Sequence, residues 1–439
     1  MQHIDPQGAG RREMDIAKQG RTTRSRAGNE ESARVGPLAH VRILDLSRIM
    51  AAPWATQIFA DLGADVIKVE RPGAGDDTRA WGPPFLKGED GAKTREAGYY
   101  LAVNRGKRSI TIDMAKPEGQ EIIRRLAGTA DVVIENFKVG ALARYGLDAA
   151  SLRALYPNLI YCSVTGFGQD GPRCDQAAYD FAIQAMGGLM SVTGERDDMP
   201  GGGPQKVGVP IVDIMTGMYA AVAVLAALAR RAETGQGETI DVAMLDVQAA
   251  FLANQAMNWL ISGRAPKRNG NRHPNIQPQD VFPCRDGHLV LAVGNDGQFA
   301  KLCQVVGCPE WSSDERFSAN AARVQNNAVL TPLLVERFRA FPRAELIAAL
   351  DKAGVPCAPI NDIPQVFEDP QIKHRGMLRD LPHPLAGTVP QVISPLRFAD
   401  ASLRFDRAPP LLGQHNAEVL AELGLDEAAV TDLSAHGII

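Results

Sequence analysis

The chain has 439 residues, of which 45% are hydrophobic and 22% charged, and its formal net charge is −4. This length allows two domains, the composition is that of a globular enzyme, and the weak charge gives no sign of nucleic-acid or anionic-membrane binding. The six cysteines and eight histidines show no CxxC, HExxH or other metal-ligand spacing. We therefore expect no structural metal and a reducing, cytoplasmic environment.

The first 38 residues are polar and mixed in charge, with few apolar side chains. Such a composition cannot bury a core, so residues 1–38 are expected to be a disordered tail. The segment lacks the apolar run of a secretory signal, and its acidic residues argue against a transit peptide.

Apolar segments alternate with amphipathic ones from Val41 onward. Strands are predicted for the four segments VRILDL (41–46), ADVIKVE (64–70), ADVVIENF (130–137) and LIYCSVTGFG (159–168). A helix opening at Pro53 and ending at Gly63, and two more near 118–128 and 151–157, lie between them. Alternating strands and helices predict an α/β fold with a doubly wound, Rossmann-like parallel sheet. No GxGxxG follows the first strand, so a dinucleotide fingerprint is missing.

The later chain predicts a second, smaller α+β domain. A strand pair turning at Asp286-Gly287 opens it, and several helices follow. We expect the large α/β domain at 39–235, a linker helix and loop at 236–280, the small domain at 281–375 and a return to the large domain at 376–439. Within the linker, a short strand is expected to run into one long helix that ends near residue 262.

The central segment, residues 208–231, predicts a buried helix because apolar residues stand on every face of it. It is too short and too interrupted, by Thr216 and Gly217, for a convincing membrane span. One carboxylate, Asp213, lies at its start. The local pattern favours a helix N-cap, and a catalytic carboxylate at the edge of a core is the alternative.

Several polar or small residues follow predicted strands, and parallel strands place such residues along one edge of a sheet. They occur in the loop 49–53, at Arg71, in the basic segment NRGKRSI (104–110), and in ENF (135–137). Tyr179 and Asp180 precede another apolar helix. Each has an ordinary alternative as a turn, a solvated basic turn, a cap or packing. Together they favour a binding edge for a large phosphorylated ligand.

These segments resemble the class III CoA-transferase family, also called CaiB/BaiF, from about residue 38 to the C-terminus. The resemblance rests on ILDLSRIMAAP, DLGADVIKVERPGAGDDTR, NRGKRSI, DVVIENF, YCSVTGFGQDGP, AYD, GVPIVDIMTG and TGQGETIDVAMLD. GAGDDTRAWGPPF and the closing PPLLGQH are most similar to succinyl-CoA:glutarate (hydroxymethylglutarate) CoA-transferases.

The resemblance implies roles for individual residues. Asp213 corresponds to the catalytic aspartate, and its place at a helix N-terminus is expected to keep it anionic. The CoA contacts correspond to Ile49, Met50, Ala51, Arg71, Ile112, Asn136, Phe137 and Arg144. The substrate-lining positions correspond to Tyr99, Tyr179, Asp180 and Gly270. Formyl-transferring members carry Gln at the position of Met50, lysines at the positions of Ala115 and Ala177, and a glycine tetrad in place of the loop 270–273. These differences argue against formyl or oxalyl specificity.

The implied reaction moves CoA from an acyl-CoA donor, expected to be succinyl-CoA, to a carboxylic acid such as glutarate through aspartyl-anhydride and aspartyl-CoA intermediates. CoA thioester is then a substrate, with no permanently bound cofactor. The family forms homodimers of interlocked rings. An α-methylacyl-CoA racemase is the alternative enzyme, although those relatives carry histidine at Tyr179, and a CoA-binding subunit without turnover is the non-enzymatic alternative. Arg105, Arg272 and His273 are candidates for binding a distal carboxylate.

Overall fold

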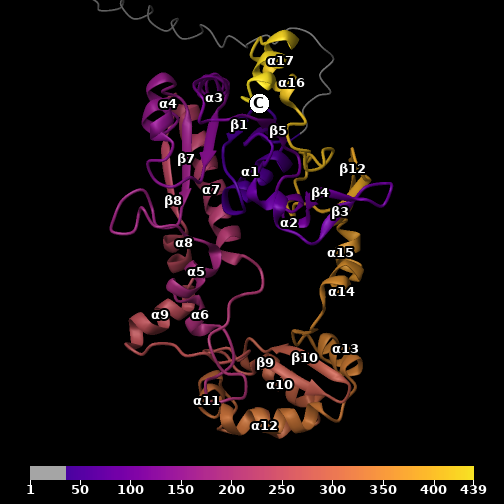
Figure 1. The fold of residues 1–439 in the computed structure, drawn as a ribbon. Coiled ribbons are helices and arrows are strands. Elements are labelled where there is room, and N and C mark those ends of the chain that lie inside the picture. The colour runs from indigo at the N-terminus through magenta and orange to yellow at the C-terminus, as the bar shows by residue number, and fades with distance from the viewer. Residues whose placement is uncertain (1–35) are drawn as a thin grey trace, which may run out of the picture. The chain divides into compact units, whose positions relative to one another are not determined.

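A computed structural model describes residues 36–439, so the predicted tail, 1–38, lies almost wholly outside the described residues. Six parallel strands form the main sheet in the order β5-β2-β1-β6-β7-β8 (Figure 1). The strands are β1 Arg42–Asp45, β2 Asp65–Glu70, β5 Arg108–Thr111, β6 Val132–Glu135, β7 Ile160–Thr165 and β8 Thr239–Ala243. This is the doubly wound order, and its direction of winding reverses between β1 and β6. The α/β prediction is confirmed.

Helices cover both faces of the sheet. α1 (Ala51–Asp61) and α7 (Ile211–Thr234) pack on the face that includes Ile43. α3 (Pro117–Thr129), α4 (Ala149–Leu155), α16 (Asn416–Glu422) and α17 (Glu427–Ala435) pack on the face that includes Leu44. Neighbouring strand residues point to opposite faces, so strands that are buried on both sides read as continuous apolar runs.

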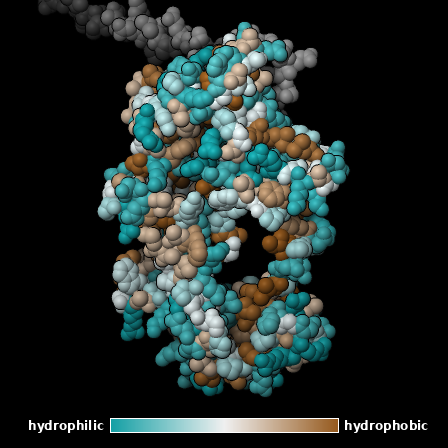
Figure 2. All heavy atoms as spheres, viewed as in Figure 1, coloured by the Kyte–Doolittle hydropathy of each residue, from teal (hydrophilic) through white to brown (hydrophobic). Residues whose placement is uncertain are grey.

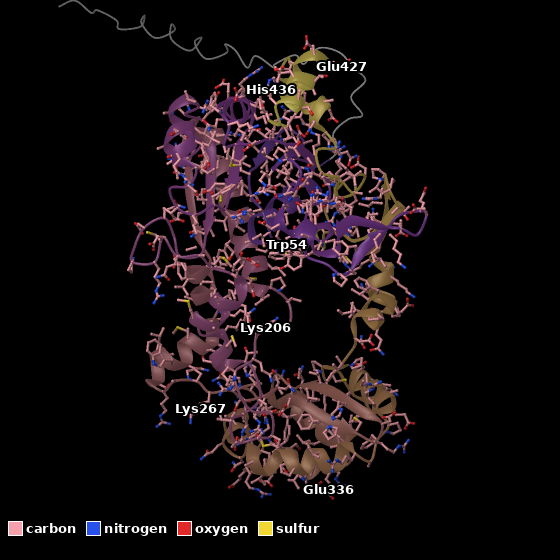
Figure 3. The ribbon with its side chains drawn as sticks, viewed as in Figure 1. Trp54, Lys206, Lys267, Glu336, Glu427 and His436 are labelled. Carbon is pink, nitrogen blue, oxygen red and sulfur yellow. The ribbon has the colours of Figure 1, made fainter. Side chains whose placement is uncertain are left out.

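α1 and α7 lie side by side, and a glycine allows their close approach. A Cβ atom on Gly217 of α7 would lie 2.4 Å from the carbonyl oxygen of Ala51 and 3.1 Å from the Trp54 side chain. Trp54, labelled in Figure 3, therefore contacts α7 at this position. α1 begins at Ala51, two residues before the predicted start at Pro53, and the contact with Gly217 lies at this first turn.

Of the helices within residues 36–439, α7 alone is long and apolar enough to cross a membrane. About 39% of its most apolar window is buried within the chain. This is weak evidence for a span, because a core helix passes the same test, and α7 packs against α1, β7, β8 and α8.

The basic segment NRGKRSI is neither a solvated turn nor a phosphate-binding cluster, and both interpretations were wrong. Its last residues form β5, and its three cations are buried. Arg105 pairs with Asp61 at 2.7 Å, Lys107 with a carboxylate on β1 at 3.1 Å, and Arg108 with Asp65 at 2.7 Å. The acidic partners come from α1, β1 and β2, which are distant in sequence and could not be read from the local pattern.

A separate core lies between Phe282 and Val355. It is built on β9 (Gln279–Cys284), β10 (Gly287–Ala292) and β11 (Cys357–Pro359), with α10 (Asp296–Val305), α11 (Asn320–Gln325), α12 (Asn327–Phe338) and α13 (Arg343–Ala353). β9 and β10 are antiparallel, as predicted, and they turn at Arg285-Asp286, one residue before the expected Asp286-Gly287. The exact domain boundaries stay a prediction.

The remaining helices and strands include two separate two-stranded antiparallel sheets. They are β3 (Phe85–Lys87), β4 (Lys93–Ala97), α2 (Gly98–Leu101), α5 (Asp180–Met186), α6 (Leu189–Val192), α8 (Met244–Ala250), α9 (Ala253–Ser262), α14 (Ile363–Glu368), α15 (Pro370–His374), β12 (Leu378–His383) and β13 (Gly387–Val392). The long helix expected before residue 262 is interrupted between α8 and α9, where Ala253 has a φ of 46°. That backbone conformation is incompatible with a continuous helix.

Candidate active site

A pocket of about 230 Å³ opens beyond the carboxyl ends of β1, β6 and β7. Asp213 of α7 lines it, together with the N-terminal end of α1. The loops after the strands supply most other lining residues, which include Arg48, Ile49, Met50, Ala51, Asn136, Phe137, Thr165, Gly166 and Tyr179. Pockets at this edge, next to the point where the winding reverses, are the usual ligand sites of doubly wound sheets.

Asp213 is not the cap of α7. It is the third helical residue, and the cap position is occupied by Pro210. The carboxylate of Asp180 provides the cap instead, accepting hydrogen bonds from the backbone N–H of Val212 at 2.7 Å and of Asp213 at 3.2 Å. The cap interpretation of Asp213 was therefore wrong, and Asp180, expected to cap its own helix α5, caps α7.

The pKa of Asp213 is raised to about 7, first by burial and second by the nearby charge of Asp180. Within residues 36–439 no hydrogen bond or ion pair reaches its carboxyl group, so no cation opposes these effects. The helix N-terminus was expected to keep this side chain anionic, but a pKa of about 7 leaves it partly protonated near neutral pH, because desolvation of the charged form outweighs the helix dipole. A carboxyl group that titrates near neutral pH is typical of reactive sites.

The side chain of Tyr99 lies near these carboxyl groups. Burial raises the pKa of Tyr99, and the charges of Asp213 and Asp180 raise it further, which places all three groups within electrostatic reach. Trp81 contacts Tyr99 edge to face, with ring centroids 5.1 Å apart. Sequence reasoning missed Trp81, since a tryptophan next to a Gly-Pro-Pro turn carries no signal of its own.

The loop from β1 to α1 has an unusual backbone. Ile49 has a φ of 73°, in the left-handed region that β-branched residues rarely adopt. This turn directs the chain into α1 beside Asp213. The first N–H groups of a helix have no partner within the helix, so those of Met50 and Ala51 are available at the pocket.

A longer groove of about 540 Å³ continues from the pocket, along the carboxyl ends of β2 and β5. Arg71, Ile112 and Arg144 line it. Arg48 and Phe137 line both the groove and the pocket, so the two cavities adjoin at these residues. Arg48, which sequence reasoning also missed, lies 5.6 Å from the Phe137 ring through its guanidinium carbon.

Other predicted residues lie elsewhere in the chain. Gly270 is absent from the lining of both cavities, and its N–H donates to the carbonyl of Gly194 at 3.1 Å. Arg105 cannot bind a substrate carboxylate, because it is buried and its guanidinium already forms a bidentate pair with Asp61 at 3.0 and 2.7 Å. Among residues 36–439 no group of three or more His, Cys, Asp or Glu side chains could hold a metal.

Comparison with known proteins identifies the family of this chain. The model of CoA-transferase family III matches residues 38–416. The chain is 50% identical over 398 residues to a succinate–glutarate CoA-transferase of Agrobacterium fabrum, covering 91% of this chain and 98% of the relative. It is 40% identical over 406 residues to the human succinyl-CoA:glutarate CoA-transferase, covering 92% of this chain and 90% of the relative.

A solved structure also indicates the CaiB/BaiF family. The crystal structure of a CaiB/BaiF family protein from Brucella suis aligns with a TM-score of 0.78 at 52% identity, covering 89% of this chain and 100% of that one. The chain belongs to CoA-transferase family III, and it is an enzyme of the transferase class.

Proposed function

We propose that this enzyme transfers CoA from succinyl-CoA to a small dicarboxylic acid, with Asp213 as the nucleophile. The observation that carries the proposal is the position of Asp213, in a small pocket between the N-terminus of α1 and the end of a longer groove. CoA would lie along the groove with its adenine end near Arg71 and Arg144, its middle near Ile112, and its thioester at Ile49, Met50 and Ala51. Phe137 marks the passage between the two cavities.

The reaction consists of four acyl-transfer steps at Asp213. Its oxygen attacks the donor thioester carbonyl, the C–S bond breaks, and CoA thiolate leaves an aspartyl–acyl anhydride. The thiolate attacks the aspartyl carbonyl, which releases the donor acid and forms an aspartyl-CoA thioester. The acceptor carboxylate attacks the carbonyl of this thioester, the C–S bond breaks, and CoA thiolate leaves a second, aspartyl–acceptor anhydride. The thiolate then attacks the acceptor acyl carbon of that anhydride, which gives the acceptor-CoA thioester and frees the Asp213 carboxylate. Covalent catalysis of this type replaces one difficult exchange with separate acyl transfers.

The pocket supplies what these steps need. An oxyanion forms at each tetrahedral intermediate, and the free N–H groups at the start of α1, including that of Ala51, are donors suited to stabilise it. The raised pKa of Asp213 makes its carboxylate more basic than an exposed one, at the cost of being half protonated near neutral pH. Tyr179 lines the pocket in which the acid would bind, and Tyr99 and Asp180 lie near Asp213 without lining it.

The direct test replaces the nucleophile. We expect Asp213→Ala and Asp213→Asn to lower kcat for exchange between succinyl-CoA and glutarate by about 10³-fold or more. Intact-protein mass spectrometry of the wild type with succinyl-CoA alone should detect a CoA adduct at Asp213 that the variants lack. Asp246→Asn is the matched control, since Asp246 is also the third residue of its helix, α8, but is exposed and outside both cavities. Exchange retained in Asp213→Ala would refute the nucleophile.

The choice of acids is supported by the two relatives, which are named for succinate or succinyl-CoA and glutarate. A pocket of about 230 Å³ suits a short acid. Exchange from succinyl-CoA should be fastest with glutarate or a substituted glutarate, and slower with malate, itaconate and monocarboxylates. A preference for monocarboxylates would refute this part of the proposal. Release of an α-proton to solvent would indicate racemase chemistry instead.

We also infer that the enzyme is a cytoplasmic homodimer of interlocked chains. Large apolar side chains are exposed on α5, α7 and α9, and they include Phe181, Met218, Tyr219, Val222, Trp259 and Ile261. Figure 2 places apolar side chains over the region of α5, α7 and α8. A second copy is the occupant that would bury them without a membrane. Light scattering should give twice the chain mass of 47.2 kDa in the absence of detergent; a monomer would contradict the inference.

A further inference from the structure

The loop between β1 and α1 is held by side chains from three other segments. The side chain of Asn136, just after β6, accepts the N–H of Arg48 at 2.9 Å and donates to the carbonyl of Arg48 at 2.7 Å. Both ends of its amide are thus committed to one residue of the loop. Asn136 was expected to contact CoA, and this geometry gives it a different partner.

The neighbouring backbone groups are held in the same way. Asp45 accepts the N–H of Ser47 at 2.9 Å, and Lys68 donates to the carbonyl of Ser47 at 2.7 Å. Asp76 accepts the N–H of Ile49 through both carboxylate oxygens at 3.2 Å. Every backbone polar group from the Ser47 N–H to the Ile49 N–H therefore bonds to a side chain rather than to regular secondary structure.

The supports of this loop are themselves rigid. Lys68 and Asp76 form an ion pair at 2.9 Å, and neither side chain is exposed to solvent. Asp76 also accepts the N–H and hydroxyl of Thr78, while its own N–H donates to Glu70. A carboxylate with this many partners has a fixed position, and so does the N–H that it holds.

The restrained residue is the one with the unfavourable conformation. Ile49 has a φ of 73° and adjoins Met50 and Ala51, which line the pocket of Asp213. A β-branched residue persists in the left-handed region only where surrounding contacts enforce it. Without the side-chain bonds, the loop would relax and the first N–H groups of α1 would turn away from the pocket.

We propose that Asn136 is a positioning residue which, together with the buried Lys68–Asp76 pair, holds Ile49 in its left-handed conformation and thereby directs the first N–H groups of α1 at the carbonyl attacked by Asp213. The proposal rests on the proposed function. We call Asn136, Lys68 and Asp76 the clamp. The contact of Asn136 with the loop lies between β1 and β6, where the winding of the sheet reverses and the long groove meets the pocket of Asp213.

The test separates positioning from CoA binding. We expect Asn136→Ala to lower kcat for succinyl-CoA:glutarate exchange about 10- to 100-fold, while KM for succinyl-CoA changes less than about threefold. Arg144→Ala, in the long groove, is the comparison variant and should raise KM with little change in kcat. An Asn136→Ala variant with normal kcat and a raised KM would show that Asn136 is a CoA ligand and would overturn the proposal.

A double-mutant cycle tests the role of Ile49. Glycine adopts positive φ without a Cβ penalty, so the loop in Ile49→Gly depends less on the clamp. The effect of Asn136→Ala on kcat should fall to less than about threefold in the Ile49→Gly background. An equal effect in both backgrounds would mean that Asn136 does not act through the conformation of Ile49.

Two further measurements keep the outcomes distinct. Asp76→Asn retains the shape of the second support and should also lower kcat, so the proposal does not depend on one variant folding. An unchanged kcat in a folded Asp76→Asn variant would count against the role of Asp76. Wild-type protein that fails to exchange CoA at all would refute the transferase function itself. Wild-type exchange with an unaffected Asn136→Ala would refute only the positioning role.

Discussion

Two groups of carboxylates in this enzyme behave in opposite ways: one group is buried behind α1, and the other, Asp213 with Asp180, is half-buried at the pocket. Behind α1, Asp45 is buried, yet the attractions of Lys107 and Lys68 overcome desolvation and lower its pKa to about 2. The same balance lowers the pKa of Asp76 and of Glu70. In the pocket, Asp213 has a carboxylate neighbour in place of a cation, and its pKa is raised to about 7.

Burial by itself therefore does not decide the charge of a side chain in this protein. We call Asp45, Glu70 and Asp76 with their partners Lys107, Arg79 and Lys68 the network behind α1. Each of these carboxylates faces a lysine or arginine, so the pairs stay ionised and fix the loop that precedes the helix. In the pocket, the absence of a cationic partner among the described residues leaves Asp213 poorly stabilised as an anion. The first arrangement gives rigidity, and the second gives a carboxylate that can react.

Breaking the network should have the largest effect on stability. We expect Lys68→Met to lower the free energy of unfolding by about 3–5 kcal/mol, because it leaves Asp76 and Asp45 buried without this partner. Urea denaturation of the purified variants measures the change. The exposed pair of Arg196 and Asp198 is the control, and Arg196→Ala should leave the midpoint unchanged within error. Equal effects of the two substitutions would contradict the contrast between buried and exposed pairs.

Removing the charge of Asp213 should have the opposite sign. Its pKa is raised from 3.8 to about 7 on folding, so its contribution to stability is full below about pH 4 and is lost as pH rises through 7. Asp213→Asn should therefore be more stable than the wild type by on the order of 2 kcal/mol at pH 8, with the difference vanishing near pH 4. A constant difference across this range would mean that Asp213 does not titrate as described.

The pH dependence of exchange should report the same group. The nucleophile must be ionised, so kcat/KM is expected to fall tenfold per pH unit below about pH 7. In Asp180→Asn this limb should move to lower pH, because the nearby negative charge that raises the pKa of Asp213 is gone. Asp246→Asn should leave the limb in place. An unshifted limb in Asp180→Asn would contradict the coupling between the two carboxyl groups.

The contribution of the network behind α1 to stability should be lost only at low pH, well below the pH at which activity falls. The lowered pKa of Asp45 means that its contribution to stability is present above about pH 4 and is lost as pH falls through about 2. Between pH 7 and 5 the wild type should therefore lose exchange activity without any fall in its unfolding midpoint, because protonation of Asp213 stabilises the fold in this range and Asp45 stays ionised. Circular dichroism and exchange assays on the same samples can separate the two; simultaneous loss would mean that the pocket and the network titrate together.

Local patterns predicted the strands well where both faces are apolar. VRILDL and ADVVIENF are short, mostly apolar runs next to turn residues, and they became β1 and β6 at the centre of the sheet. The pattern of NRGKRSI failed because the carboxylates that pair its three cations come from α1, β1 and β2. Charge reads as exposure unless the partner is known, and the partner is a property of the tertiary structure.

The properties of Asp213 can also be divided into those predicted from the sequence and those set by the tertiary structure. From the sequence, Asp213 was predicted to start a long apolar helix and, through resemblance, to correspond to a catalytic aspartate. The helix forms, but it is not buried on every face, because Met218, Tyr219 and Val222 are exposed. Only the tertiary structure decided that Asp180 caps that helix, that Asn136 and Asp76 hold the opposite loop, and that no cation among the described residues neutralises the carboxylate. The physical reason is that helix formation depends on neighbours in the chain, whereas the pKa of a buried group depends on charges brought close by folding.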